Sequence, residues 1–203
     1  MLETAICVLC GYLVGTINPA WLIARLKRVD LQRKGTGNLG ATNASMFLGK
    51  RVGVVILLFD VGKTFTAIKL AAVIFPDLAM AGVLTGSATI IGHVFPYYLG
   101  FKGGKGLACL GGLVLGLDWR MALPLLAIGI VGSLIANYAC AVPFTAAPLF
   151  PVLYGIRTQS MAGFLILSVP AACVVMKHME NIRRIKAGEE LTVREYLKGK
   201  THS

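Results

Sequence analysis

Residues 2–24 decide the fold: they read L-E-T-A-I-C-V-L-C-G-Y-L-V-G-T-I-N-P-A-W-L-I-A and are followed at once by Arg25-Leu26-Lys27-Arg28. An apolar run of roughly 20 residues is long enough to cross the hydrocarbon core of a bilayer as a helix. The segment begins Met1-Leu2-Glu3, without the basic residues that open a cleavable signal peptide. We therefore expect it to remain in the protein as a membrane helix.

The rest of the chain repeats this pattern. Of its 203 residues, 56% are apolar and only 14% are charged, and the mean hydropathy is +0.75, whereas soluble domains carry about 25% charged residues. Six more apolar stretches follow the first, at residues 52–75, 78–99, 107–117, 121–139, 141–154 and 161–176. These predict an all-α integral membrane protein with a bundle of seven transmembrane helices. We expect a membrane domain at residues 1–177 and a basic cytoplasmic tail at 178–203.

Glycines recur at helix-packing spacing within the apolar stretches. Three pairs lie four residues apart, namely Gly11 and Gly15, Gly82 and Gly86, and Gly112 and Gly116. Small residues at this spacing let membrane helices approach closely. The pattern predicts tight packing inside one bundle, with dimerisation as an alternative.

The distribution of positive charge predicts the orientation. Sixteen of the twenty Lys and Arg residues fall in three segments that this topology places on one side: Arg25, Lys27, Arg28, Arg33, Lys34, Lys50 and Arg51; Lys102 and Lys105; and Lys177, Arg183, Arg184, Lys186, Arg194, Lys198 and Lys200. Cytoplasmic loops are enriched in Lys and Arg. We therefore expect the N-terminus outside and the C-terminus in the cytoplasm.

Three polar segments lie on that predicted cytoplasmic side. The first, in the loop at residues 27–51, reads G-T-G-N-L-G-A-T-N at 35–43. Glycines alternating with short hydroxyl and amide side chains let backbone N–H groups converge on an anion. A flexible connection between two spans is the alternative interpretation.

The second segment contains His93 and continues as L-G-F-K-G-G-K-G at residues 99–106. Two lysines among four glycines, directly before an apolar helix, favour a phosphate-binding loop because charge, amide donors and a helix dipole act at one place. The nucleotide P-loop spacing is absent, since Gly106 follows Lys105. Anchoring to lipid headgroups is the alternative.

The third segment, H-M-E-N-I-R-R at residues 178–184, follows the last apolar stretch. If the helix continues, His178, Asn181 and Arg184 share one face at a spacing of three, and His178 could exchange a proton near neutral pH. A juxtamembrane basic helix attracted to anionic lipids is the alternative.

Other chemistries find little support in the sequence. No carboxylate pair is spaced for two metal ions, and the three histidines are far apart without flanking ligands, so we expect no metal and no cofactor. The basic loops lack interleaved aromatic residues, which argues against a nucleic-acid partner. Asp60 and Lys63 are ionisable within an apolar stretch; we interpret them as a structural pair, with a functional role as the alternative.

Together, the three segments resemble one family: the bacterial acyl-phosphate-dependent glycerol-3-phosphate acyltransferases, known as PlsY. The resemblance covers nearly the whole chain, with the motifs in the family's order and spacing. It implies seven membrane helices in a bacterial cytoplasmic (inner) membrane and an active site facing the cytoplasm. The implied reaction moves a fatty acyl group from acyl phosphate to the 1-hydroxyl of sn-glycerol 3-phosphate, yielding lysophosphatidic acid and phosphate.

The resemblance also implies roles for individual residues. His178, Lys105 and Asn181 would be catalytic, with His178 and Asn181 facing the acceptor. The substrate phosphates would be bound by residues of all three segments: Thr36, Gly37, Asn38, Gly40, Thr42, Asn43, Lys102, Gly103, Gly104, Gly106 and Arg184. Acyl phosphate, glycerol 3-phosphate and membrane lipids would be the partners.

The sequence departs from the family pattern at three places. Met46 stands where members usually carry Arg, Asn137-Tyr138-Ala139-Cys140 replaces an Arg-Tyr and a following Ser, and Met179 stands in place of Arg. A thioether cannot make the bidentate phosphate contact of a guanidinium. A relative with another acceptor, or a lipid-binding or transport protein without catalysis, is therefore the alternative function.

Overall fold

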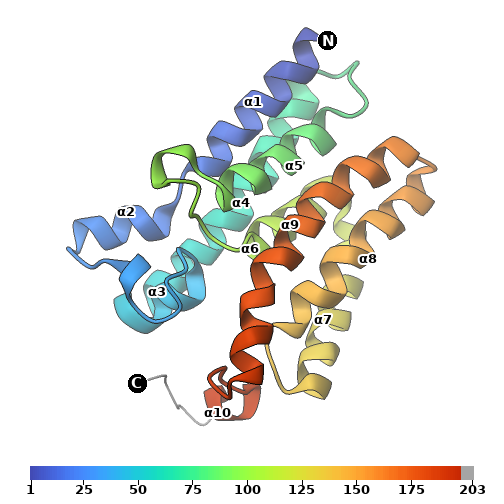
Figure 1. The fold of residues 1–203 in the computed structure, drawn as a ribbon. Helices are drawn as coiled ribbons and strands as arrows, with labels where there is room; N and C mark the ends of the chain where they lie inside the picture. Colours follow the sequence, from blue (N-terminus) through green and yellow to red (C-terminus); the bar gives the residue numbers. More distant parts are fainter. Residues whose placement is uncertain (198–203) are drawn as a thin grey trace. The chain divides into compact units, whose positions relative to one another are not determined.

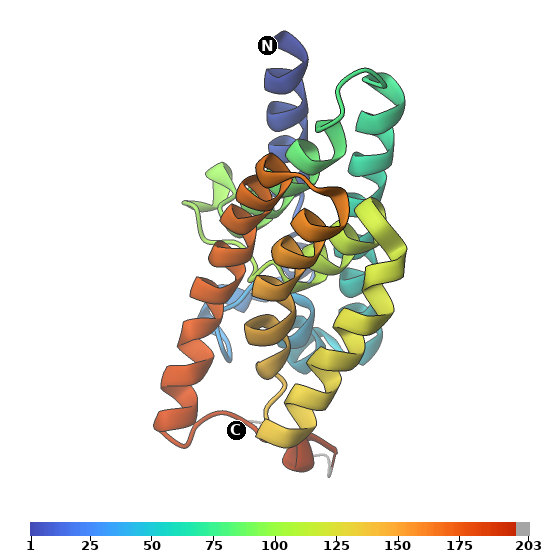
Figure 2. The ribbon, with the colours of Figure 1, turned by 90° about the vertical axis from the view of Figure 1, so that its right-hand side faces the viewer.

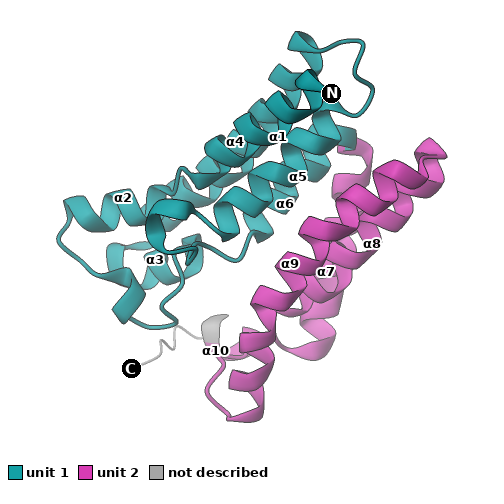
Figure 3. Cartoon of the chain, turned by 45° about the horizontal axis from the view of Figure 1, so that its top comes forward, with its two compact units in different colours: residues 1–118 teal, residues 119–203 magenta. Residues whose placement is uncertain are grey.

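The computed structural model describes residues 1–197, and in this part of the chain all the regular structure is helical (Figure 1). The predicted tail residues 198–203, which include Lys198 and Lys200, lie outside the described residues. The chain divides into two compact units, Met1–Asp118 and Trp119–Ser203 (Figure 3). Each of the seven predicted apolar stretches lies mainly on helices.

The first unit holds six α-helices and two short 3-10 turns. Its elements are α1 (Leu2–Thr16), α2 (Pro19–Leu26), η1 (Leu31–Arg33), α3 (Ala41–Leu48), α4 (Lys50–Ile74), α5 (Ala81–Val94), η2 (Tyr97–Leu99) and α6 (Leu107–Asp118). Helix α4 contacts α1, α5 and α6, so it lies at the centre of the unit's packing. The polar segments predicted at residues 35–43 and 99–106 both belong to this unit.

The first apolar stretch forms two helices instead of the expected single one. Ile17 is extended, and α2 begins after Asn18, whose Oδ1 accepts a hydrogen bond from the Trp21 N–H at 2.9 Å. Pro19 occupies the first turn, where its missing N–H is tolerated and its fixed φ favours helix. The Asn-Pro pair therefore starts a new helix at the polar end of the stretch.

Glycines set the spacing between the helices of the first unit. A Cβ at Gly11 or Gly15 of α1 would overlap the backbone oxygen of Thr85 or Thr89 on α5. The other two predicted pairs also pack within the unit, since a Cβ at Gly112 would overlap the Val61 oxygen. The predicted helix packing within one bundle is confirmed at these positions.

The second unit is built from hairpins of adjacent helices. Its elements are η3 (Trp119–Met121), α7 (Ala122–Ala136), α8 (Ala141–Thr158), α9 (Met161–Lys186) and α10 (Val193–Leu197). Helix α8 packs against both α7 and α9, as Figure 2 shows for the yellow, orange and red segments. The expected boundary between residues 177 and 178 falls inside α9, because that helix runs without interruption into the basic segment.

Within residues 1–197, three helical runs are long and apolar enough to cross a bilayer: Leu2–Leu26, Leu107–Ala136 and Met161–Lys186. The middle run joins two stretches that we expected to be separate spans. Helix α4 is the longest helix of the first unit but carries Asp60, Lys63 and Lys69. Seven crossings and the orientation of the termini therefore stay predictions. Leu58, Leu123 and Ile135 expose large apolar side chains, which suits a hydrocarbon environment.

The contact between α1 and α5 can be tested at Gly15. We expect Gly15→Ala to lower the free energy of unfolding by about 1–3 kcal/mol, because the added methyl group overlaps backbone that cannot rotate away. The measurement is the thermal unfolding midpoint in detergent. Gly62→Ala on α4 is the matched control, since a Cβ there meets nothing within 4 Å. Equal midpoints for the two variants would contradict the close approach.

Candidate active site

The first polar loop is organised around Asn43, at the start of α3. Its side chain is 1% exposed. Nδ2 donates to the carbonyl oxygens of Leu31 and Lys34 at 3.2 and 3.1 Å, and Oδ1 accepts from the Thr36 N–H at 3.2 Å. Asn43 therefore uses both ends of its amide to fold the loop.

The remaining hydrogen bonds of this loop are also local. The Gly37 N–H donates to Lys34 O at 3.0 Å, and the Asn38 N–H donates to Thr36 Oγ1 at 3.4 Å. Gly35 and Gly37 have positive φ angles of 56° and 67°, which glycine adopts readily. Gly40 caps α3, and Thr42 lies exposed on its first turn. The N–H groups of Thr36, Gly37 and Asn38 are thus used inside the loop, so these three amides are not open to an anion.

The second loop is held against the end of α5. The N–H groups of Gly103 and Gly104 donate to Val94 O and His93 O, each at 3.1 Å. A Cβ at Gly104 would overlap the His93 ring at Nε2, so glycine is needed there for close approach. Gly106, at φ 83°, accepts from the Leu110 N–H at 2.8 Å. Lys105 is therefore placed directly before α6, as the sequence predicted.

The two loops meet in the first unit. Gln32 of η1 donates through Nε2 to the Lys102 carbonyl oxygen at 3.4 Å. The Asn18 Nδ2 donates to Leu39 O at 3.1 Å, and the Tyr98 hydroxyl donates to Thr16 O at 2.7 Å. Both loops are thus tied to the junction between α1 and α2. Lys102 is exposed and Lys105 is partly buried.

The third segment lies on α9 in the second unit. His178 is 6% exposed, and its Nδ1 lies 2.7 Å from Val174 O. Because a carbonyl oxygen only accepts, Nδ1 carries a proton and Nε2 is the basic nitrogen of the neutral ring. Asn181 lies on the same helix and is also buried.

Glu190 binds two of the predicted residues. Its Oε1 accepts from Asn181 Nδ2 at 2.7 Å, and its Oε2 lies 3.1 Å from Arg184 Nε. After α9 ends, the chain turns at Gly188, whose φ is 71°. This turn returns the Glu190 carboxylate to the side of α9. Sequence reasoning missed Glu190; the glycine just beyond the basic helix was the available signal.

The positions that depart from the family pattern have different surroundings. Met46 is partly buried on α3, and Met179 is 46% exposed on α9. Asn137 is in the left-handed region, and its Oδ1 and main-chain oxygen accept from the N–H groups of Arg194 and Val193 at 3.3 and 2.9 Å. Cys140 is buried before α8. At Asn137 the replacement residue thus anchors the start of α10.

One buried group has the composition of a metal site. Ligand atoms of Asp60, His93 and Cys109 all lie within 4.8 Å of one another. The Lys63 ammonium already lies 2.8 Å from Asp60 Oδ1 and 3.1 Å from His93 Nδ1. The ammonium therefore occupies the position beside Asp60 Oδ1 and His93 Nδ1 that a metal ion would need. The group does not fit a metal ion while Lys63 is in place. The pairing of Asp60 with Lys63 expected from the sequence is confirmed.

Comparisons with known proteins agree with one another. The family model described as glycerol-3-phosphate acyltransferase matches residues 5–188. A protein of Geobacter sulfurreducens named glycerol-3-phosphate acyltransferase is 38% identical over 194 residues, covering 94% of this chain and 97% of the relative. One of Geotalea daltonii with the same name is 35% identical, with the same coverage of each chain.

Solved structures give the same result. Crystal structures of PlsY, an integral membrane glycerol 3-phosphate acyltransferase, match in a glycerol 3-phosphate form and in a lysophosphatidic acid form. The first has a TM-score of 0.84 at 32% identity and covers 93% of this chain and 94% of that chain; the second has a TM-score of 0.83 at 31% identity, with coverage of 96% and 98%. The family match over most of the length, together with the two polar loops and the helical membrane fold, shows that this chain belongs to the glycerol-3-phosphate acyltransferase family.

Proposed function

We propose that this protein transfers a fatty acyl group from acyl phosphate to the 1-hydroxyl of sn-glycerol 3-phosphate, releasing lysophosphatidic acid and inorganic phosphate. The observation that carries the proposal is the junction of two cation-bearing loops through Gln32 and Lys102. Two phosphorylated substrates need two anion sites close together, and Lys34, Lys102 and Lys105 supply positive charge on these loops. The glycerol 3-phosphate and lysophosphatidic acid forms of the matched PlsY support the choice of acceptor and product.

The proposed reaction needs positioning and charge neutralisation more than a strong nucleophile. The acceptor hydroxyl oxygen attacks the acyl carbonyl carbon, an ester bond forms, and the bond to phosphate breaks with its electron pair going to phosphate. Lys105 neutralises the phosphate as charge grows on it, and the loops hold both substrates in line. Phosphate is already a good leaving group, so no metal is invoked.

The proton of the acceptor hydroxyl must move to a base, and there are two candidates for this base. His178 presents Nε2 as its basic nitrogen because Nδ1 binds Val174 O, and a phosphate oxygen of the substrate is the other. In this proposal His178 and Asn181 face the acceptor, and Glu190 fixes the orientation of the Asn181 amide. We place the three segments on the cytoplasmic side of a bacterial inner membrane, because they are rich in Lys and Arg and cytoplasmic loops are enriched in these residues.

The acyl chain requires an apolar path that reaches the loops. A groove of ≈ 710 Å³ between α1 and α5 is lined by Val8, Leu9, Tyr12, Ala88 and Ile91, among others. The Tyr12 hydroxyl donates to Phe95 O at 2.9 Å, next to the start of the second loop. We propose that the donor's acyl chain lies in this groove, with its phosphate toward Lys105.

Lys105 is the sharpest test of the proposed reaction. We expect Lys105→Ala to lower the rate of lysophosphatidic acid formation about 10²–10³-fold, the usual effect of removing one group that stabilises developing negative charge. The measurement follows phosphate release and lipid product from acyl phosphate and glycerol 3-phosphate. Lys27→Ala, which removes an exposed lysine, serves as the control. A wild-type rate in Lys105→Ala would rule out the role assigned to this residue.

Met46 tests whether the acceptor has changed. If a missing cation weakens binding of glycerol 3-phosphate, Met46→Arg should lower its KM about 10-fold or more, as a new charge-assisted contact to phosphate is worth roughly 1.5–3 kcal/mol. Met46→Gln is the uncharged control. Donor hydrolysis without transfer in the wild type would favour another acceptor, and an equal gain in both variants would exclude charge as the cause.

A further inference from the structure

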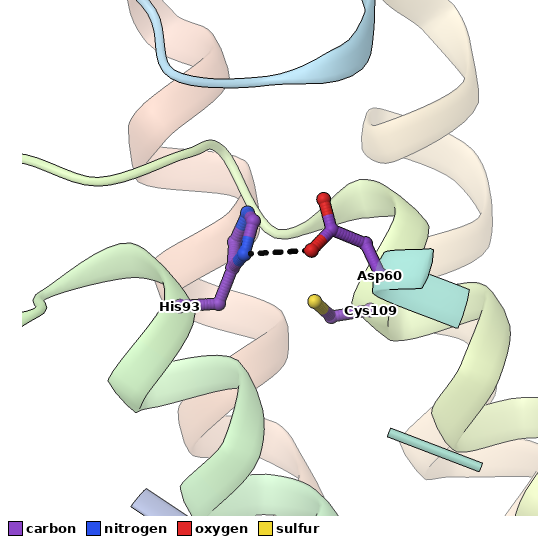
Figure 4. Close-up of side chains that lie close together, drawn as sticks. All are labelled: Asp60, His93 and Cys109. Carbon is purple, nitrogen blue, oxygen red and sulfur yellow. Dashed lines mark ion pairs between the residues drawn. The ribbon is translucent and has the colours of Figure 1, made fainter. Parts of the chain in front are cut away.

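A buried cluster of charged and polar groups lies in the first unit, outside the proposed substrate contacts. Asp60 and Lys63 are one turn apart on α4, and His93 is near the end of α5; they are 2%, 8% and 3% exposed. Lys63 Nζ lies 2.8 Å from Asp60 Oδ1, and His93 Nδ1 lies 3.4 Å from the same oxygen. Figure 4 shows the His93 ring directed at the Asp60 carboxylate, with Cys109 beside them. Charges buried this deeply are costly unless each is paired.

Lys63 connects this cluster to the first loop. Its ammonium donates to Ile17 O at 2.7 Å and to Gly15 O at 3.2 Å, the carbonyls where α1 ends. The next residue, Asn18, donates to Leu39 O inside the loop. Lys63 of α4 therefore binds the backbone at the break between α1 and α2, and Asn18 connects this break to the first loop by a hydrogen bond.

His93 connects the same cluster to the second loop. Its carbonyl oxygen accepts from the Gly104 N–H, and its ring fills the space that a Cβ at Gly104 would need. Nδ1 lies 3.1 Å from Lys63 Nζ and 3.4 Å from Asp60 Oδ1, so the ring contacts both members of the α4 ion pair. Lys63 and Asp60 thereby hold the ring's orientation against Gly104, next to Lys105.

We infer that Asp60, Lys63 and His93 are positioning residues that set the distance between the first and second loops. Lys63 binds the α1–α2 junction, to which the first loop is hydrogen-bonded, and His93 packs against Gly104 of the second loop. Asp60 offsets the lysine charge and fixes its ammonium. The inference rests on the proposed function, in which these loops bind the two phosphorylated substrates. None of the three residues is assigned a contact with substrate.

The test separates positioning from plain stability with a charge-neutral pair. Asp60→Asn and Lys63→Met should each lower the thermal midpoint, because each leaves one buried charge unpaired. Asp60→Asn combined with Lys63→Met removes both charges and should recover most of that midpoint. It should still raise the KM of at least one phosphorylated substrate about 10-fold, since the α1 carbonyls lose their donor, the His93 ring loses the charged groups that hold it, and small misplacements of binding groups are costly. Lys69→Met, an exposed lysine on the same helix, should change neither quantity.

Hydrogen exchange gives a readout independent of turnover. In the double variant, exchange of the Gly103 and Gly104 amides should accelerate, whereas amides in the middle of α5 keep their rates. Wild-type turnover of acyl phosphate and glycerol 3-phosphate decides the proposed function separately. Unchanged loop exchange, or unchanged KM values, in a double variant of recovered stability would overturn the inference.

A second pair of variants tests the ring contact itself. In the wild type, Gly104→Ala should raise the KM of the substrate bound by the second loop, because the added methyl group overlaps the His93 ring. In a His93→Ala background the methyl group has room, so the same substitution should raise this KM much less. Equal effects of Gly104→Ala in both backgrounds would contradict the contact. Stoichiometric zinc in the purified protein that is lost in Cys109→Ala would also overturn the inference, because the cluster would then be a metal site.

Discussion

The ammonium group of Lys63 is the interaction on which the first unit depends. It has three N–H donors and is surrounded by the oxygens of Gly15, Ile17 and Asp60 and by His93 Nδ1. An isolated ammonium in an apolar bundle would be costly, and here the Asp60 carboxylate and the α1 carbonyls compensate its charge. The end of α1, the middle of α4 and the end of α5 are therefore fixed relative to one another by one side chain.

Close packing of the helices makes this arrangement possible. Gly15 and Gly92 have no side chains between α1 and α5: a Cβ at Gly92 would overlap Tyr12 O, and one at Gly15 would overlap Thr89 O. The two backbones approach closely enough for one lysine to reach the carbonyls of α1 and the imidazole of α5. The packing glycines and the buried charges thus lie at the same end of the first unit, where both polar loops begin.

The sequence predicted the helical membrane fold and the loops, because these follow from local patterns. Apolar runs gave the helices, glycine spacing gave their packing, and Lys105 was correctly placed before an apolar helix. The break at Asn18-Pro19 was missed because apolarity continues through it, although the dipeptide is a helix-start signal. Glu190 and the roles of Asn43 and His93 were missed for another reason: each depends on contacts between segments distant in sequence, which periodicity does not reveal.

Two glycines of the second loop, Gly103 and Gly104, use their N–H groups within the protein. In a glycine-rich anion site the backbone N–H groups are expected to point at the anion, but those of Gly103 and Gly104 bind the carbonyls of α5. Here the absent side chain matters more than the amide, because Gly104 makes room for the His93 ring. The first loop follows the same logic, since Asn43 takes up its carbonyls and one of its amides. In the proposed reaction these amides are therefore not the phosphate donors, and side-chain cations and hydroxyls would have to bind the substrates at these positions.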